Sequence, residues 1–374
     1  MRIGTSATAP RRSPGSLGLA MLVSGLVAGS VTVLAPSTAA DIGTELSGPG
    51  VDPDPRPTSS ARALDLLDKV ASADDLVRYA GVQFVSAWGP ESTDSTLVEI
   101  KNVPGQGTAL RVRGSGDGPA SALFTTAPGD IGFQLGGGPV GLLARNFSIS
   151  TAGKDKVTGR KTRVLEMVGD RDAVAARFWI DDRSGVLLRR EVYDASGRTV
   201  RASAFVQVRI GPRVSPGHLP PALPQARAED LTASEVATMR VSGCSCPALL
   251  ADGLSLYQVR RVDTSAGTVL HLSYSDGLST VSLFEQPGRV DETSMVGYTP
   301  TADRDGVRYV RAGLPQQVVW SADGVVYAVV ADAPARLVDE VVAGLPHQAP
   351  EPDGLTNRIG RGLARVGSWV NPFA

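Results

Sequence analysis

The sequence has few of the residues that usually carry chemistry. Its 374 residues include two cysteines, three histidines and 5% aromatic side chains. His218, His271 and His347 are far apart, and none belongs to a metal-binding helix pattern such as H-E-x-x-H. A G-x-S-x-G motif is also missing, so a hydrolase built on that turn would have no nucleophile. We therefore expect no enzyme, no catalytic residue, no metal site and no cofactor.

Neither sign of charge dominates the chain. The formal net charge is −1, and removing the three arginines of residues 1–40, which contain no acid, leaves −4 for the remainder. A mildly acidic surface has no broad positive field for a phosphate backbone. We therefore expect no nucleic-acid partner.

One long apolar run stands near the N-terminus. It extends from Leu17 to Ala35, follows Arg11 and Arg12, and precedes a group of small residues. This order is typical of a secretory signal peptide, which we predict over residues 1–40. The protein is thus expected in the periplasm or another extracytoplasmic part of the cell envelope. The run is long for a signal core, so an uncleaved anchor is the alternative.

The two cysteines, Cys244 and Cys246, are separated by one residue. Outside the cytoplasm they are expected to oxidise. A disulfide between positions i and i+2 is strained unless the backbone bends, and strained disulfides are more easily reduced. We favour a small staple at the start of a domain, or two buried thiols, over a redox switch or half of a metal site. No histidine lies near the pair in sequence to complete a zinc site.

Proline and glycine divide the chain, which contains 26 prolines and 42 glycines. Residues 41–60 are predicted to be a linker, and residues 213–240 a stiff, proline-rich connector. These segments predict an N-terminal domain over residues 61–212 and a smaller domain over residues 241–346. Residues 347–374 hold a further linker and a last helical segment.

The first domain is predicted to begin with a short helix around residues 64–70, which Ser59 and Ser60 are available to cap, and to continue as strands. Apolar and polar side chains alternate at 79–88 and at 200–210, which places one face of each strand in a core. Turn residues split 178–210 into a three-stranded antiparallel meander. The glycine-rich residues 114–141 are expected to be loops. The apolar residues expected on the core face are Val82, Phe84, Trp88, Val200, Ala202, Ala204, Val206, Val208 and Ile210.

The second domain is predicted to contain further short strands followed by one helix. Three strands fall within residues 254–285, and a hairpin covers 318–330. Pro334 then opens a helix whose apolar residues recur at helical spacing. His271 lies on a strand and is expected to be half-buried rather than a general base. The fold class is therefore α+β, mostly antiparallel β.

The last predicted helix is amphipathic and basic. Its apolar residues recur at helical spacing beside three arginines, with a tryptophan near the end. Such a helix packs back on its own domain, docks in a partner's groove or lies on a membrane surface. Its residues are Leu355, Arg358, Ile359, Arg361, Leu363, Arg365, Val366 and Trp369.

Several segments, taken in order, match a known pattern. They are YAGVQFV at 79–85 after the first helix, FWIDDRSGVLLRRE at 178–191 followed by DASGR at 194–198, and HLSYSDGLSTVSLF at 271–284. The first three resemble the N-terminal domain of the MucB/RseB family of sigma-factor regulatory proteins, and the last resembles its C-terminal domain. The resemblance extends over about residues 61–345.

The resemblance implies an unclosed, half-barrel antiparallel sheet with helices across its mouth, like the LolA and LolB lipoprotein carriers, followed by a smaller β domain. It also implies a function. Family members bind the extracytoplasmic part of a membrane-spanning anti-sigma factor, shield it from a protease and so restrain an envelope-stress sigma factor, until a lipid-like ligand relieves the restraint.

The alternative implied by the same fold is a lipid or lipoprotein carrier of the cell envelope. Trp88, Phe133, Phe147 and Phe178 are the candidates for lining a lipid cavity on the curved sheet. The Cys-Ser-Cys pair and the basic C-terminal helix depart from the better-known members of the family. The expected partners are therefore an anti-sigma ectodomain, a lipid and, through the last helix, a membrane surface.

Overall fold

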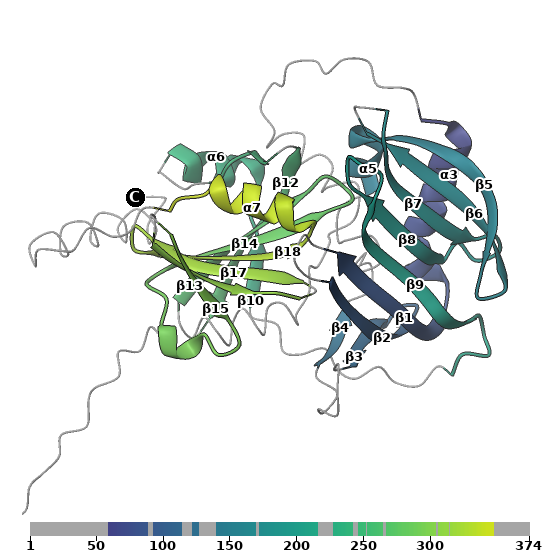
Figure 1. Ribbon diagram of the computed structural model, residues 1–374, viewed down its shortest axis with the longest axis horizontal. Coiled ribbons are helices and arrows are strands. Elements are labelled where there is room, and N and C mark those ends of the chain that lie inside the picture. Colours follow the sequence, from purple (N-terminus) through teal and green to yellow (C-terminus); the bar gives the residue numbers. More distant parts are fainter. Residues whose placement is uncertain are drawn as a thin grey trace, which may run out of the picture.

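The computed structural model describes eleven stretches of the chain: residues 59–88, 93–113, 122–126, 140–169, 172–215, 227–241, 246–251, 253–264, 267–303, 306–313 and 315–347. They form two units that lie side by side, each built on an open antiparallel sheet (Figure 1). The predicted fold class is confirmed. The predicted signal peptide, most of the first linker and the predicted C-terminal helix lie outside the described residues.

The first unit contains a nine-stranded sheet in the order β4-β3-β2-β1-β9-β8-β7-β6-β5. Its outer strands, β4 and β5, do not pair with each other within the described residues, so the sheet is unclosed. The strands are β1 (Tyr79–Trp88), β2 (Thr93–Val103), β3 (Gly107–Arg113), β4 (Ala122–Thr126), β5 (Ser148–Val157), β6 (Arg160–Val168), β7 (Val174–Asp181), β8 (Leu187–Tyr193) and β9 (Thr199–Ile210).

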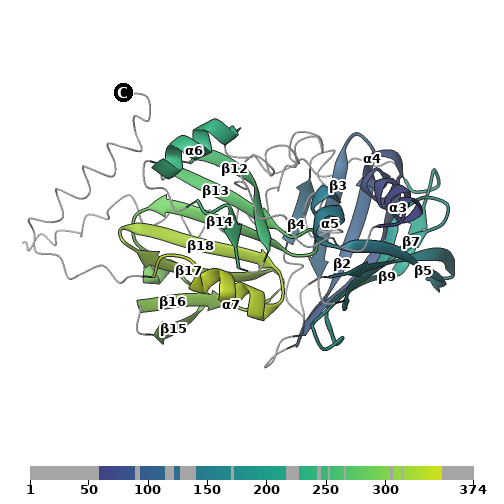
Figure 2. The same cartoon turned by 90° about the horizontal axis from the view of Figure 1, so that it is seen from above.

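Three helices accompany this sheet: α3 (Ala61–Ala71), α4 (Ala73–Leu76) and α5 (Val140–Asn146). The sheet bends around α3 and α4 (Figure 2). Ser60 caps α3 as predicted, because its side chain accepts a hydrogen bond from the amide of Ala63 at 3.3 Å. The apolar face of α3 packs with strands β5 to β8 in one core, in which Phe178 is fully buried. Residues of both α3 and α5 belong to this core, so the two helices lie on the same face of the sheet.

The predicted meander is confirmed, since β7, β8 and β9 pair in sequence order. Asp181 ends β7 and organises the turn. Its buried carboxylate accepts two hydrogen bonds from Arg160, at 2.7 and 3.0 Å, and two from Ser184, at 2.7 and 3.0 Å. Burial opposes ionisation of Asp181, but these bonds outweigh it and lower its pKa below the ordinary value. The turn therefore depends on a charged group inside the protein.

Replacing Asp181 with asparagine is expected to lower the free energy of unfolding by about 2–4 kcal/mol, because Arg160 would lose its charged partner. Asp182→Asn is the matched control. Its carboxylate pairs with Arg163 at 2.8 Å but is 26% exposed, against 3% for Asp181. We expect a cost below about 1 kcal/mol there. Urea unfolding of both variants measures the difference, and equal costs would contradict this account of the turn.

The predicted core face of β1 is wrong. Phe84 and Trp88 are each 38% exposed, whereas Gln83 is 1% and Val85 is 4% exposed. The face of β1 that looks toward the helices is therefore the one that carries Gln83 and Val85. Alternation predicted the strand, but the curvature of the sheet decides which face is covered.

The predicted core face of β9 is also wrong in its centre. Val206 is 57% exposed, while Phe205 is 3% and Arg201 is 7% exposed. The register of β9 against β1 shifts between Val82 and Gln83, which marks a β-bulge. Gly81 lies beneath the Phe205 ring, where a Cβ would come within 2.9 Å of it. The missing side chain of Gly81 thus leaves space for Phe205 on the covered face.

Two further elements of the first unit were not predicted as such. Strand β4 lies within residues 114–141, which were expected to be loops, and α5 begins at the end of that range. The sequence of β4 shows no clear alternation of apolar and polar residues, so it was not recognised as a strand. Its pairing with β3 defines it as one.

The second unit contains a nine-stranded sheet in which β10-β12-β13-β14-β18-β17-β16-β15 follow one another and β11 also pairs with β12. All five strands predicted here are present. The strands are β10 (Arg227–Asp230), β11 (Leu249–Leu250), β12 (Leu254–Thr264), β13 (Gly267–Ser275), β14 (Thr280–Pro287), β15 (Thr299–Asp303), β16 (Gly306–Arg311), β17 (Gln316–Ala322) and β18 (Val325–Asp332). A short 3-10 helix, η2 (Glu292–Ser294), follows β14.

Helix α7 (Ala335–Ala343) follows β18, and Pro334 is its N-cap. Its residues Val338, Val341 and Val342 are buried in the core of the second unit. The segment after α7 contacts Trp320, whose indole N–H donates a hydrogen bond to the carbonyl of Pro346 at 2.8 Å. The core of the second unit therefore lies between α7 and the strands.

The second unit holds two α-helices rather than the single helix predicted. Strand β10 and all but the last residue of helix α6 (Ala233–Val241) lie inside residues 213–240, which were predicted to be a connector. Leu231 and Val236, at 2% and 0% exposure, belong to the core of the second unit, which therefore begins at β10. The proline-rich part of the connector misled the prediction about the residues that follow it.

A local signal for α6 is present in the sequence. Thr232 and Glu235 form a capping box, in which the Glu235 carboxylate accepts from the Thr232 amide at 2.8 Å and the Thr232 hydroxyl accepts from the Glu235 amide at 3.3 Å. The T-x-x-E pattern would have located the start of this helix.

Cys246 is 2% exposed and disulfide-bonded, and Cys244 lies outside the described residues. Within the described ranges, no helix is both long enough and apolar enough to cross a membrane. The same part of the chain contains no group of three or more His, Cys, Asp or Glu side chains placed to hold a metal ion.

Candidate binding site at the domain joint

Two of the four predicted cavity residues belong to one core. Phe178 is fully buried in the core beneath α3, and Phe147 packs against the same core. Trp88 is 38% exposed at the end of β1 and does not belong to this core, and Phe133 is outside the described residues. A role for these residues in holding a lipid stays a prediction.

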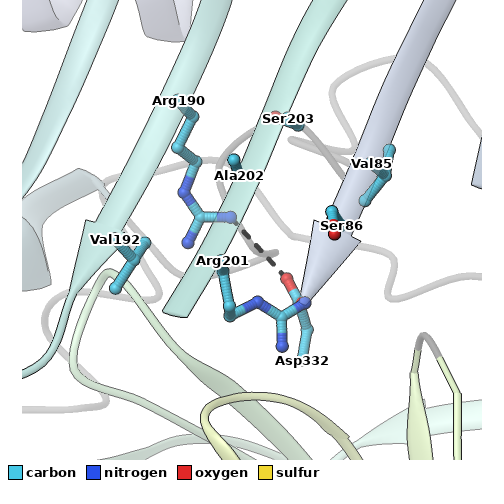
Figure 3. A pocket seen from close by; sticks show the side chains of 8 residues that line it. All are labelled: Val85, Ser86, Arg190, Val192, Arg201, Ala202, Ser203 and Asp332. Atoms are coloured by element: carbon cyan, nitrogen blue, oxygen red, sulfur yellow. Dashed lines mark ion pairs between the residues drawn. The ribbon is translucent and has the colours of Figure 1, made fainter. Parts of the chain in front are cut away.

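A pocket lies where the two units meet, and sequence reasoning missed it. It combines the first sheet with the end of β18 in the second unit (Figure 3). The space inside it is about 20 Å³, which is room for little more than one water molecule. Its lining residues are Val85, Ser86, Arg190, Val192, Arg201, Ala202, Ser203 and Asp332.

Two arginines from neighbouring strands converge on one carboxylate in this pocket (Figure 3). Arg201 forms an ion pair with Asp332 and donates to the carbonyl of Ala333 at 3.1 Å. Arg190 lies 3.7 Å from Asp332 and donates to the carbonyl of Leu278. Both arginines belong to the first unit, and all three of their partners belong to the second.

Both arginines are buried, at 5% exposure for Arg190 and 7% for Arg201. Burial lowers the pKa of Arg190 to about 10 and that of Arg201 to about 9, and the charge of Arg190 further lowers the pKa of Arg201. Both remain charged at neutral pH. Both arginines contact the carboxylate of Asp332, and the charge of Asp276 acts on Arg190 as well. Removing the Asp332 carboxylate would therefore leave Arg201 buried without its ion-pair partner.

The turn between β13 and β14 makes the second contact between the units. Leu278, at 3% exposure, packs inside the core of the first unit. Asn146 of α5 donates to the carbonyl of Asp276 at 2.9 Å. Gly277 has a φ of +98°, and a Cβ on it would lie 2.6 Å from the amide nitrogen of Leu143. Only glycine fits this backbone position, because both its φ and the nearby helix exclude a side chain.

The carboxylate of Asp276 keeps this turn in shape. It accepts hydrogen bonds from the amides of Leu278, at 2.7 Å, and Ser279, at 2.6 Å. Burial nevertheless raises the pKa of Asp276 above its ordinary value. The turn is therefore an ordered loop that presents Leu278 to the first unit.

Two further titratable groups lie buried within the second sheet. His271, at 3% exposure, stacks on Phe284 with a ring separation of 4.4 Å, and its Nε2 lies 3.0 Å from the hydroxyl of Ser282. Burial and the charge of Arg260 lower its pKa to about 3. Glu285 is 2% exposed, and burial raises its pKa to about 8. His271 is thus more deeply buried than predicted.

The arrangement of the joint is suited to recognition. Three side chains of the first unit bind carbonyl oxygens of the second, and an arginine pair binds a carboxylate. Arg189, next to Arg190, shows the alternation of the strand: it lies 4.4 Å from the Trp179 ring and pairs with Glu191 on the other face. The consecutive arginines Arg189 and Arg190 in β8 were the sequence signal for this site. Consecutive side chains of a strand point to opposite faces, so one of the two arginines must face the covered side of the sheet.

The fold and the joint define a protein of two open-sheet domains held together by buried contacts between side chains and main chain. Residues 129–223 match the family model described as the MucB/RseB N-terminal domain. This match agrees with the resemblance seen in the sequence, and the matched residues include Arg190 and Arg201. No curated protein matches the sequence.

Three solved structures are similar to this chain at low sequence identity. MucB is 18% identical, with 77% of this chain and 98% of that chain covered and a TM-score of 0.42. The MucA/MucB complex of Pseudomonas aeruginosa is 18% identical, with 78% and 100% covered and a TM-score of 0.40. The LolA superfamily protein NE2245 of Nitrosomonas europaea is 9% identical, with 72% and 91% covered and a TM-score of 0.19.

Proposed function

We propose that this chain is an exported regulator that binds the extracytoplasmic part of a membrane-spanning anti-sigma factor and thereby restrains a sigma factor of the envelope-stress response. The observation that carries the proposal is the MucB/RseB N-terminal domain at residues 129–223. The predicted signal peptide supports an extracytoplasmic location. The joint adds physical support, because it already binds peptide carbonyls and a carboxylate with side chains of the matched domain.

The test is a binding measurement with purified components. The chain from residue 41 to 374 is titrated with the ectodomain of a single-span anti-sigma factor from the same organism. We expect a one-to-one complex with a Kd of about 1 µM or tighter. An unrelated ectodomain of similar size and charge is the control. No heat of binding and no co-elution at concentrations well above that value would refute the proposal.

A lipid or lipoprotein carrier is the second candidate. A carrier needs a cavity between the sheet and its helices. In the described residues that space is filled, since Leu143 and Phe178 are fully buried and Leu278 enters from the second unit. A carrier would therefore have to open before it could accept an acyl chain. Mass spectrometry of the purified protein under native conditions would detect a bound lipid, and its presence at one molecule per chain would favour this candidate.

A further inference from the structure

The first unit binds the second as it would bind a peptide. Asn146, Arg190 and Arg201 donate to main-chain carbonyls of Asp276, Leu278 and Ala333. Every peptide offers main-chain carbonyl oxygens, whatever its side chains are. Three such contacts across one interface are the chemistry of main-chain recognition.

Two side chains of the second unit complete the contact. Leu278 is buried in the apolar core of the first unit, and Asp332 occupies the pocket between Arg190 and Arg201. We call residues 276–278 and 332–333 the resident loops. Together they present an apolar side chain, a carboxylate and carbonyl oxygens to one face of the first sheet.

We propose that the resident loops occupy a peptide-binding site of the first domain, and that a segment of the partner carrying an apolar side chain and a carboxylate replaces them. The inference rests on the proposed function and names the chemistry of its partner. The domains must separate at the joint before the partner binds. Affinity is therefore reduced by the fraction of molecules that are closed, and any change that opens the joint raises it.

The contacts favour a peptide over a lipid as the replacing ligand. A lipid has an apolar chain and an anionic headgroup, which could replace Leu278 and Asp332. A diacyl lipid carries two ester carbonyls, whereas Asn146, Arg190 and Arg201 bind three carbonyl oxygens at present. Leaving these donors buried without acceptors would cost free energy at each position. A peptide offers a main-chain carbonyl at every residue.

Two substitutions that break the same ion pair distinguish this site from a merely structural contact. Asp332→Asn weakens the resident loop and leaves the arginines free for the partner, so we expect the ectodomain to bind about tenfold more tightly. Arg201→Gln opens the joint but removes a contact that the partner needs, so we expect binding at least about tenfold weaker. A structural role would move both variants in the same direction. Asp339→Asn, an exposed position on α7, is the control and should bind like the wild type.

Arg201→Lys is a second variant that controls for loss of the fold. It keeps the positive charge but loses the planar guanidinium group, so its affinity for the ectodomain should lie between those of the wild type and Arg201→Gln. Small-angle scattering without partner gives an independent measurement. We expect a larger radius of gyration for Asp332→Asn than for Asp339→Asn.

The outcomes separate the two proposals. If the wild type binds the ectodomain and Asp332→Asn and Arg201→Gln shift in the same direction, the inference is overturned and the proposed function stands. If no variant binds, the proposed function fails. An unchanged radius of gyration for Asp332→Asn overturns the inference whatever the partner does. The Asp332→Asn variant is also tested with vesicles of anionic phospholipid. If it binds these vesicles more tightly than it binds the ectodomain, the inference is overturned in favour of a lipid ligand.

Discussion

Gly277→Ala is expected to separate the two domains, whereas Gly253→Ala is not. Both glycines lie in turns of the second unit and have nearly the same φ, +98° and +101°. An alanine therefore suffers the same backbone strain at either position. The difference is in their surroundings, because a Cβ on Gly277 would lie 2.6 Å from the amide nitrogen of Leu143, and a Cβ on Gly253 would have nothing within 4 Å.

The expected result is a loss of domain contact at Gly277 alone. We expect an increased radius of gyration, faster proteolysis at the connection between the domains, and an unfolding free energy about 1–3 kcal/mol lower than that of Gly253→Ala. Small-angle scattering and urea unfolding measure the two effects. The same radius of gyration in both variants would mean that the turn is not what holds the joint closed.

The stability of the second unit is expected to be greatest between about pH 4.5 and 6.5. The cause is the opposite burial effect on two groups in neighbouring strands. Glu285 has its pKa raised from the ordinary 4.5 to about 8, and His271 has its pKa lowered from the ordinary 6.5 to about 3. Each group is neutral in the folded sheet over a range in which it is charged in the unfolded chain.

The direction of each effect follows from proton binding. Folded Glu285 holds a proton that the unfolded chain has released, so its contribution is complete below pH 4.5 and is lost as the pH rises to about 8. Folded His271 lacks a proton that the unfolded chain binds, so its contribution is complete above pH 6.5 and is lost as the pH falls toward 3. The two slopes cancel in the interval between.

We expect losses of about 2 kcal/mol between pH 6.5 and 8 and again between pH 4.5 and 3. Glu285→Gln should remove the alkaline loss and His271→Gln the acid loss, each without affecting the other. Glu229→Gln, whose side chain is 68% exposed, is the control. Urea unfolding at a series of pH values gives the curves. A Glu285→Gln curve parallel to that of the wild type above pH 6.5 would rule out this role for Glu285.

Much of the fold was predictable because the signals are local. In the turn after β8, the carboxylate of Asp194 accepts from the amides of Ser196 and Arg198, at 2.9 and 3.0 Å. Such Asp-Ser-Gly turns between alternating strands located the meander and the hairpins of the second sheet. The helix before β1 followed from its cap at Ser60 and its apolar spacing.

The errors arose where distant residues decide the structure. The register shift that buries Phe205 and exposes Val206 depends on the pairing of β9 with β1, and no window of β9 contains it. Residues of the joint are farther apart still: Arg201 binds the carbonyl of a residue 132 positions later, and Asn146 one 130 positions later. Leu278 was an apolar residue in a turn, and its burial is explained only by the other domain.

The distribution of tryptophans supplies each domain with its own optical reporter. Trp320 is 2% exposed in the second unit, where the Tyr327 ring stacks on it at 5.4 Å. Trp179 lies in the first unit, 4.4 Å from the Arg189 guanidinium. Their fluorescence emission should differ, because the indole of Trp320 lies in an apolar interior and that of Trp179 lies beside a positive charge. With Trp88 and Trp369 replaced by phenylalanine, quenching experiments could therefore follow the melting of each half in the intact molecule, without attached dyes.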